Sequence, residues 1–584
     1  MRILLVHPDD SIEADFIAGA GAGARWDFAV DLGWSGRHAY SQQSERLGFR
    51  VFSIYDVLDH AQHGRRMREL LAFGFDQVVD SESVDWWEAF SVFPYAQLEQ
   101  LMLLLALAEQ IPDDAEMIAT RPHFAARALS LLLHREIRVL SAESRSGLRA
   151  RSRRYLKAAF ALRPSQLAEI ALDKWDTDYR FRRHFARTPK ISPASVILLP
   201  SAYVNVSRAQ VAYARMLPHR RFLLVVTRRN GRLKNLPSNI EMRSLAAYVP
   251  DFPPACGEER TRLLARWQDL KNERFESNLL YRIANKLHVF DGFPRFLQSG
   301  LRIRDGWREV LVRERVSTVF SADEYNPYTR LPTLLARPRR INTVSCDHGA
   351  LNLNFAIRRS VSDTYLMKGD MARDYCLSWD VLPTGKIVVG GPAEAPLQPR
   401  TQTSRDWIVF YSEAYELSFA RTQTFYAELL PELCDLAKRT NRKVIVKLHP
   451  FESLRVRTLL VHKVLPAEDR GLVEMRDGPM TAELFARAWC SLTVESSVAA
   501  ESALNGVPCF LCGWFDGSWY DYGKQFAKFS AGYTLDSPRR IREIPELLEQ
   551  LQVTEATRRG LQTSMSAERL ESVLSGPDEL RKCS

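Results

Sequence analysis

The sequence has few of the features that mark metalloproteins or disulfide-stabilised proteins. Its eight cysteines stand at positions 256, 346, 376, 434, 490, 509, 512 and 583, a spacing that fits neither a zinc site nor a disulfide framework. The one CxxC, Cys509 to Cys512, lies in an apolar run of strand length and predicts burial. No persuasive Asp-x-Asp pair is present, so we expect no metal and no cofactor.

Long apolar runs are also absent. The first residues, MRILLVHPDD, contain a run of strand length but no signal-peptide core or cleavage site. The longest apolar stretch, LEQLMLLLALAEQIP, is shorter than the roughly 20 residues that span a bilayer. We therefore expect a buried helix at this stretch and a cytoplasmic protein.

Nucleic-acid binding is disfavoured because no module interleaves basic with exposed aromatic residues. The 80 Lys and Arg against 70 Asp and Glu give a net charge of +10, which suits a protein that meets anionic ligands or surfaces. With 46% hydrophobic and 26% charged residues, the composition is that of an ordinary globular protein. A chain of 584 residues exceeds the roughly 250 to 300 of a single core, so several domains are expected.

Alternating strand-like and helical segments predict an α/β fold. We expect an N-terminal α/β domain over residues 1–140, a basic helical linker over 141–190, and a first Rossmann-like domain over 191–390. A second Rossmann-like domain should follow over 391–545, with a helical tail over 546–584. The segments 144–157 and 178–190 are basic with apolar residues between the charges. They predict a solvated linker or a peripheral contact with anionic lipid at the inner face of the plasma membrane.

Polar residues follow two strands of the second Rossmann-like domain. In KVIVKLHPFES, a strand ends at Lys447 and the following His449-Pro450 holds the imidazole at the strand's carboxyl end. This histidine is placed either to bind a ligand or to cap a turn. In SLTVESSVAAESALNGVP, Ser496 and Ser497 open a helix, as simple N-caps or as an anion site.

This order of motifs resembles the nucleotide-binding half of the GT-B glycosyltransferases, in particular the bacterial capsule, sialic-acid, Kdo and teichoic-acid groups. The resemblance covers roughly residues 190 to 540 and implies two Rossmann-like doubly wound parallel sheets. It leaves the first 140 residues unexplained, since they depart from a two-domain enzyme, and we expect there an additional α/β domain that recognises the acceptor. It implies that the phosphate of a CMP- or CDP-activated donor contacts His449, Ser496, Ser497 and Lys447. Glu501, on nearly the same helix face as Ser497, is then a candidate for the ribose hydroxyls.

The stretch VSCDHGALN places Asp347, His348 and Gly349 after an apolar strand. The same families carry an acidic-acidic-Gly or His-Gly motif here that supplies the general base, and this stretch resembles both without matching either completely. We favour His348 as the base, because an unperturbed imidazole titrates nearer neutral pH than a carboxylate. Asp347 would orient or replace it, and Gly349 would let the backbone approach the substrate. The alternative is an ordinary turn.

Other polar residues after predicted strands are candidates for lining the cleft: Asp323, Glu324, Glu413, Asn205 and Arg208. Together these features predict a metal-independent glycosyltransferase or polyol-phosphate transferase of bacterial surface-polysaccharide or glycoconjugate synthesis. Its partners would be a nucleotide-sugar donor and a glycan or lipid-linked acceptor. Two alternatives share the scaffold: a UDP-sugar 2-epimerase, which would consume UDP-GlcNAc without an acceptor, and a non-catalytic glycan- or nucleotide-binding assembly protein.

Overall fold

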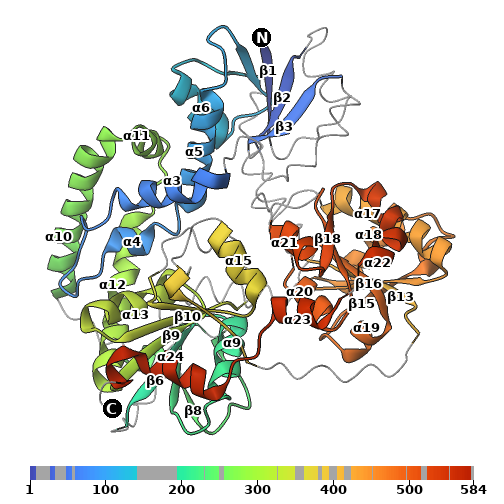
Figure 1. Ribbon diagram of the computed structural model, residues 1–584. Helices are drawn as coiled ribbons and strands as arrows, with labels where there is room; N and C mark the ends of the chain where they lie inside the picture. Colours follow the sequence, from blue (N-terminus) through green and yellow to red (C-terminus); the bar gives the residue numbers. More distant parts are fainter. Residues whose placement is uncertain are drawn as a thin grey trace. The chain divides into compact units, whose positions relative to one another are not determined.

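The chain forms an α/β structure with three parallel β-sheets (Figure 1). The computed structural model describes residues 1–7, 26–32, 48–54, 60–140, 194–228, 231–248, 255–324, 326–348, 361–378, 384–392, 404–413, 422–449, 452–494, 496–514, 522–551 and 553–580. Parallel strands need crossover connections, which helices usually supply. The predicted α/β class, with two Rossmann-like sheets and an additional N-terminal sheet, is confirmed.

The N-terminal sheet has five strands in the order β3-β2-β1-β4-β5, all paired in parallel. They are β1 (Arg2–Val6), β2 (Phe28–Asp31), β3 (Arg50–Ser53), β4 (Glu116–Ala119) and β5 (Arg138–Val139). Residues 3–6 of β1 are fully buried, as expected for a central strand covered on both faces.

The middle sheet has seven parallel strands in the order β12-β11-β10-β9-β6-β7-β8. They are β6 (Val196–Ser201), β7 (Phe222–Val226), β8 (Ile240–Ser244), β9 (Val316–Ser321), β10 (Asn342–Cys346), β11 (Thr364–Met367) and β12 (Ile387–Val389). The chain builds outward from β6 in one direction and then returns to its other side with β9. The strand order therefore reverses between β6 and β9, the usual place for a ligand in such sheets.

The C-terminal sheet has six parallel strands in the order β15-β14-β13-β16-β17-β18. They are β13 (Trp407–Tyr411), β14 (Lys443–Lys447), β15 (Val473–Arg476), β16 (Ala488–Thr493), β17 (Cys509–Cys512) and β18 (Gly532–Leu535). This is the Rossmann order, and it reverses between β13 and β16. Cys509 and Cys512 are buried in β17, as predicted.

The helices lie where the sequence alternates between strand and helical periods. They are α3 (His60–Ala72), α4 (Trp86–Phe90), α5 (Tyr95–Ala108), α6 (Phe124–Leu133), α9 (Val204–Ala214), α10 (Ala255–Asp269), α11 (Leu279–Lys286), α12 (Phe293–Arg313), α13 (Pro327–Ala336), α15 (Asp370–Ser378), α17 (Thr422–Thr440), α18 (Leu454–Val464), α19 (Ala482–Arg487), α20 (Val498–Leu504), α21 (Tyr522–Lys528), α22 (Ile544–Gln550), α23 (Glu555–Leu561) and α24 (Ala567–Leu580). The long apolar stretch near residue 100 forms α5, the predicted buried helix.

Contacts divide the chain into two compact units that do not follow the order of the sequence. Unit 1 comprises residues 1–58, 100–169 and 395–561, and unit 2 comprises 59–99, 170–394 and 562–584. Residues 59–99, which we assigned to the N-terminal domain, thus group with the middle sheet. Aromatic packing explains why this segment groups with the middle sheet. The Trp87 ring stacks on the Trp267 ring, with 5.9 Å between their centroids, and contacts the Phe275 and Phe290 rings edge-on.

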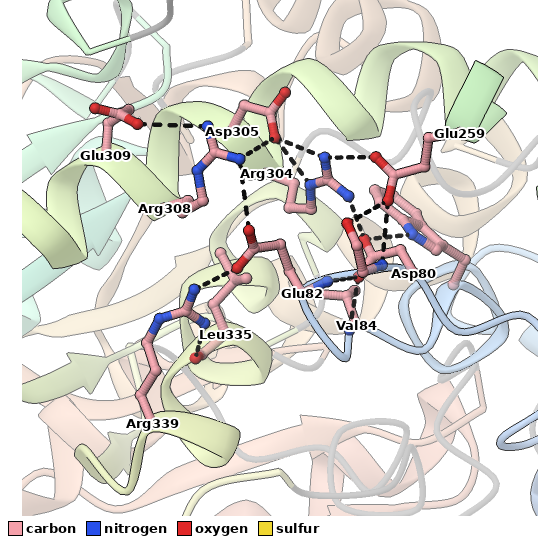
Figure 2. Close-up of polar contacts among 12 residues, drawn as sticks. Asp80, Glu82, Val84, Glu259, Arg304, Asp305, Arg308, Glu309, Leu335 and Arg339 are labelled. Atoms are coloured by element: carbon pink, nitrogen blue, oxygen red, sulfur yellow. Dashed lines mark hydrogen bonds and ion pairs between the residues drawn. The ribbon is translucent and has the colours of Figure 1, made fainter. Parts of the chain in front are cut away.

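A cluster of buried charges joins the same segment to α12 and α10 (Figure 2). Arg304 of α12 contacts Asp80 at 2.6 Å, Asp305 at 2.7 Å and Glu259 at 3.0 Å. The side chains of Arg304, Asp80 and Asp305 are 3%, 0% and 5% exposed, so this cation and two of its partners are removed from water. Such a cluster is costly to break, because removing one member leaves the others buried and uncompensated.

The predicted C-terminal tail is helical over its described part, and its helices pack on two different sheets. Helix α23 contacts α20 in unit 1, whereas α24 packs on β9 and β10 in unit 2. Leu570 and Leu574 of α24 join the core of the middle sheet with Phe320 and Val344. The final helix is therefore a structural part of the middle domain.

The predicted basic linker and its membrane contact lie outside the described residues, as does Gly349. Among the helices that the structure describes, none combines the length and apolar character needed to cross a bilayer.

Candidate functional site

The carboxyl end of the C-terminal sheet brings together two of the predicted donor-site segments and the predicted cleft-lining residue Glu413. Glu413 follows β13, His449 follows β14 and Ser496 follows β16, and these three strands are neighbours in the sheet. Glu413 Oε1 lies 3.2 Å from the Thr493 hydroxyl at the end of β16, across the point where the strand order reverses. Parallel strands end at the same edge, so these side chains lie in one region of the sheet.

His449 is half-buried, and its backbone is fixed by a carboxylate. The His449 N–H donates to Glu452 Oε2 at 2.7 Å, and the Glu452 N–H donates back to the His449 carbonyl at 2.9 Å. Burial, with a smaller contribution from the nearby Lys447 charge, lowers the pKa of His449 below its usual value. The imidazole is thus neutral at neutral pH and is able to donate one ring N–H.

Glu452 is the functional side chain that the sequence interpretation did not assign. Its other oxygen accepts hydrogen bonds from the Ser412 hydroxyl at 2.7 Å and from Arg457 Nε at 2.6 Å. Glu452 and Arg457 are each 2% exposed. Burial raises the pKa of Glu452, while Arg457 opposes that rise. The loop that carries His449 is therefore anchored to β13 and α18 by a buried ion pair.

Lys447 was predicted as a phosphate ligand, and its ammonium group is engaged with backbone carbonyls. Its Nζ donates to Leu448 O at 2.8 Å and to Gly478 O at 2.7 Å. Burial lowers the pKa of Lys447. These contacts hold β14 to the segment after β15, and one further N–H of the ammonium remains for another acceptor.

Ser496 and Ser497 differ in how they use their hydroxyls at the start of α20. Ser496 Oγ receives a long contact of 3.5 Å from the Val498 N–H. Ser497 occupies the N-cap position, and its side chain makes no capping hydrogen bond. Capping of the helix therefore does not account for the Ser497 hydroxyl.

Glu501 lies within α20, the helix that follows β16 at the carboxyl end of the C-terminal sheet. Its predicted contact with ribose hydroxyls stays a prediction.

The middle sheet places the predicted base at its own carboxyl edge. His348 follows β10, and its Nδ1 donates a short 2.5 Å hydrogen bond to the Ala322 carbonyl after β9. A carbonyl only accepts, so Nδ1 carries the proton and Nε2 holds a lone pair in the neutral ring. Burial raises the pKa of Asp347 from 3.8 to about 7, and the Lys368 charge opposes the shift. The pKa of the carboxylate that we ranked second as base therefore lies near neutral pH.

Asp323 and Glu324 are buried, and their carboxylates accept hydrogen bonds from protein groups. Asp323 Oδ1 accepts the Asn326 N–H at 3.0 Å, which shapes the turn into α13. The Glu324 carboxylate accepts hydrogen bonds from the Ser362 hydroxyl and, at 2.8 Å, from the Tyr365 hydroxyl. These contacts tie the loop after β9 to the segment before and within β11, which flanks the strand of His348.

Asn205 and Arg208 lie exposed in the first turns of α9, after β6. Ser207, between them, is buried and its hydroxyl contacts Ser201 Oγ at 2.7 Å.

The structure thus gathers Glu413, His449, Ser496 and Glu501 at the C-terminal sheet. It gathers Asp347, His348, Asp323 and Glu324 at the middle sheet. Among the residues that the structure describes, no group of three or more His, Cys, Asp or Glu side chains could hold a metal ion.

No protein-family model matches the chain, and no curated protein matches it in sequence. Solved structures to which it is similar include MnaA of S. aureus in a co-structure with UDP, at 11% identity over 65% of this chain and 95% of that chain, with a TM-score of 0.41. The UDP-GlcNAc 2-epimerase of Methanocaldococcus jannaschii matches at 12% identity over 65% and 99%, with a TM-score of 0.41. MurG of Acinetobacter baumannii matches at 12% identity over 67% and 100%, with a TM-score of 0.37.

Proposed function

We propose that this chain is a metal-independent GT-B-type glycosyltransferase, or a polyol-phosphate transferase, that uses a nucleotide-activated donor in bacterial surface-polysaccharide or glycoconjugate synthesis. The observation that carries the proposal is His449, held at the carboxyl end of a Rossmann-ordered sheet by the buried Glu452–Arg457 pair. Burying the Glu452–Arg457 ion pair costs free energy. A histidine that only capped a turn would not need such a buried carboxylate to fix its backbone.

The donor phosphate would bind at the carboxyl edge of the C-terminal sheet. The neutral imidazole of His449 donates one N–H to a phosphate oxygen, and the Ser497 hydroxyl donates a second hydrogen bond. The backbone of His449 is held in place by Glu452, so its imidazole is positioned to stabilise charge that develops on the leaving phosphate. Lys447 adds positive charge behind them.

In the reaction, the acceptor hydroxyl attacks the anomeric carbon of a sugar, or the phosphorus of a polyol phosphate. The bond to the nucleotide breaks, and the nucleotide leaves with the bonding electrons. His348 Nε2 takes the hydroxyl proton, because its lone pair is kept available by the Nδ1 hydrogen bond to Ala322. Asp347 is the alternative base, since its pKa of about 7 suits the same task.

The test is to incubate the chain with CMP-, CDP-, UDP- and GDP-activated donors, with and without a mixture of glycan acceptors, and to measure the nucleotide released. A transferase releases nucleotide from one donor class only when acceptor is present. Isomerisation of UDP-GlcNAc alone would identify a 2-epimerase instead, and no reaction with any donor would favour a non-catalytic binding protein.

Two substitutions with matched controls assign the roles. Ser497→Ala should lower kcat by roughly a hundredfold to a thousandfold, because it removes one hydrogen-bond donor to the leaving phosphate. Ser453→Ala is its control, since Ser453 is the N-cap of α18 and also makes no side-chain capping bond. His348→Asn should abolish turnover while leaving nucleotide affinity unchanged, with the exposed His288→Asn as its control. Equal loss in test and control variants would contradict these roles.

A further inference from the structure

Arg228 lies at the carboxyl edge of the middle sheet, beside the strand reversal, and pairs with no carboxylate of the part of the chain that the structure describes. Arg228 follows β7, and its Nη1 donates to the Tyr203 hydroxyl at 2.7 Å. Among the described residues, no ion pair is found for its guanidinium, which lies 5.4 Å from the centroid of the Tyr203 ring. A half-buried guanidinium has five N–H donors, so most of its hydrogen-bonding capacity remains for a ligand.

Tyr203 is itself unusual, because it is an aromatic residue left 39% exposed directly after the first strand of the middle sheet. It occupies the N-cap position of α9 without making a side-chain capping bond. Exposed aromatic rings next to polar groups are typical of surfaces that bind sugars, because one face packs on C–H groups and the edge stays polar.

A continuous set of contacts joins this pair to the proposed base. The Asn326 side chain donates to the Tyr203 hydroxyl at 3.5 Å, and the Asn326 backbone N–H donates to Asp323. Asp323 is the next residue after Ala322, whose carbonyl accepts the His348 hydrogen bond. Tyr203 and His348 are thus linked through the single loop that follows β9.

Hydrogen bonds connect Arg228 to α9 through Gly231. The Gly231 N–H donates to the Arg228 carbonyl at 3.1 Å. The Ser207 hydroxyl of α9 donates to the Gly231 carbonyl at 2.5 Å. The Asp323 and Glu324 carboxylates accept hydrogen bonds from protein groups, and among the described residues neither forms an ion pair with Arg228.

We propose that Tyr203 and Arg228 form an acceptor subsite for an anionic sugar, in which the ring packs on Tyr203 and a phosphate or carboxylate group pairs with Arg228. This inference rests on the proposed transferase function for its role in the reaction, although the binding itself does not. A planar guanidinium recognises either anion through paired hydrogen bonds, so the two sources share one chemistry.

The test measures binding of three probes to the intact chain by isothermal titration: glucose 6-phosphate, glucuronate and glucose. We expect at least one anionic probe to bind about tenfold more tightly than glucose, the effect of one charge-assisted contact. Binding of glucose 6-phosphate alone identifies a phosphate site, and binding of glucuronate alone a carboxylate site. Arg228→Gln should remove the preference for the anion, and Tyr203→Ala should weaken binding of all three probes.

Arg215→Gln is the matched control, because Arg215 is an exposed arginine at the opposite end of α9. It should bind the probes as the wild type does. Equal affinity for glucose and both anions, or a preference that survives Arg228→Gln, overturns the proposal. His449→Ala separates the two hypotheses: it should abolish nucleotide binding and leave probe binding intact, whereas Arg228→Gln should do the reverse.

Discussion

Replacement of Asp347 by Asn should stabilise the middle domain at neutral and alkaline pH. Asp347 is 7% exposed, and burial raises its pKa from 3.8 to about 7. Because the folded-state pKa lies above the unfolded one, the folded form binds the proton more tightly. The associated stability is complete below pH 3.8 and is lost as the pH rises towards 7. At 1.36 kcal/mol per pKa unit, the full loss is about 4 kcal/mol.

The asparagine variant does not ionise, so its stability relative to wild type should increase by about 3 kcal/mol between pH 4.5 and pH 8. The assay is hydrogen exchange of peptides from β10 and β11 over a urea series at each pH, which reports this domain rather than the whole chain. Asp370→Asn is the control, since Asp370 is partly exposed and paired with Arg373 in the same domain. A difference between wild type and Asp347→Asn that does not change with pH would refute the reasoning.

Two further predictions concern stability alone. Arg304→Met should lower the free energy of unfolding of unit 2 by about 3–5 kcal/mol, because it leaves buried carboxylates unpaired. The control, Arg373→Met, replaces an exposed arginine and should have little effect. Urea denaturation of the two variants measures the difference. Gly532→Ala should prevent folding of the C-terminal sheet, because the added Cβ would lie 1.6 Å from the Cys509 carbonyl oxygen. Gly471→Ala, with no atom within 4 Å of the new methyl, should fold normally; circular dichroism and soluble yield distinguish them.

In the C-terminal sheet, the strand that ends at Lys447 and the strand that contains Cys509 and Cys512 were predicted from apolar runs of strand length, whereas the order of the strands was not predicted. The positions of His449 and Ser496 after β14 and β16 followed for the same reason. Parallel sheets with crossover helices allow few topologies. The order of the strands then determines which of the loops at the carboxyl edge are neighbours. The placement of His449 and Ser496 at strand ends was predictable.

The support for His449 was not predicted, because the buried contacts of Glu452 include Ser412, which is distant in the sequence. Ser412 lies 40 positions before Glu452, and the acid was visible only as one polar residue in the turn after His449. The assignment of residues 59–99 to the N-terminal domain was wrong for a similar reason. Nothing in the local pattern tells which aromatic partners Trp87 meets.

The ranking of the two candidate bases depended on pKa values that the sequence cannot supply. We favoured His348 over Asp347 because an ordinary imidazole titrates closer to neutral pH. Burial brings the Asp347 carboxyl to the same range, so this criterion no longer separates them. The geometry still favours His348, whose tautomer is fixed by the hydrogen bond to Ala322.

The central claim is that His449 binds the phosphate of a nucleotide, and thermal-shift measurements test it most directly. We expect one of CMP, CDP, UDP or GDP to raise the Tm of the wild type and of His462→Ala, which removes an exposed histidine from α18 in the same domain. The same nucleotide should leave the Tm of His449→Ala unchanged. A nucleotide shift of equal size in His449→Ala, or no shift of the wild type with any of the four, would contradict the account.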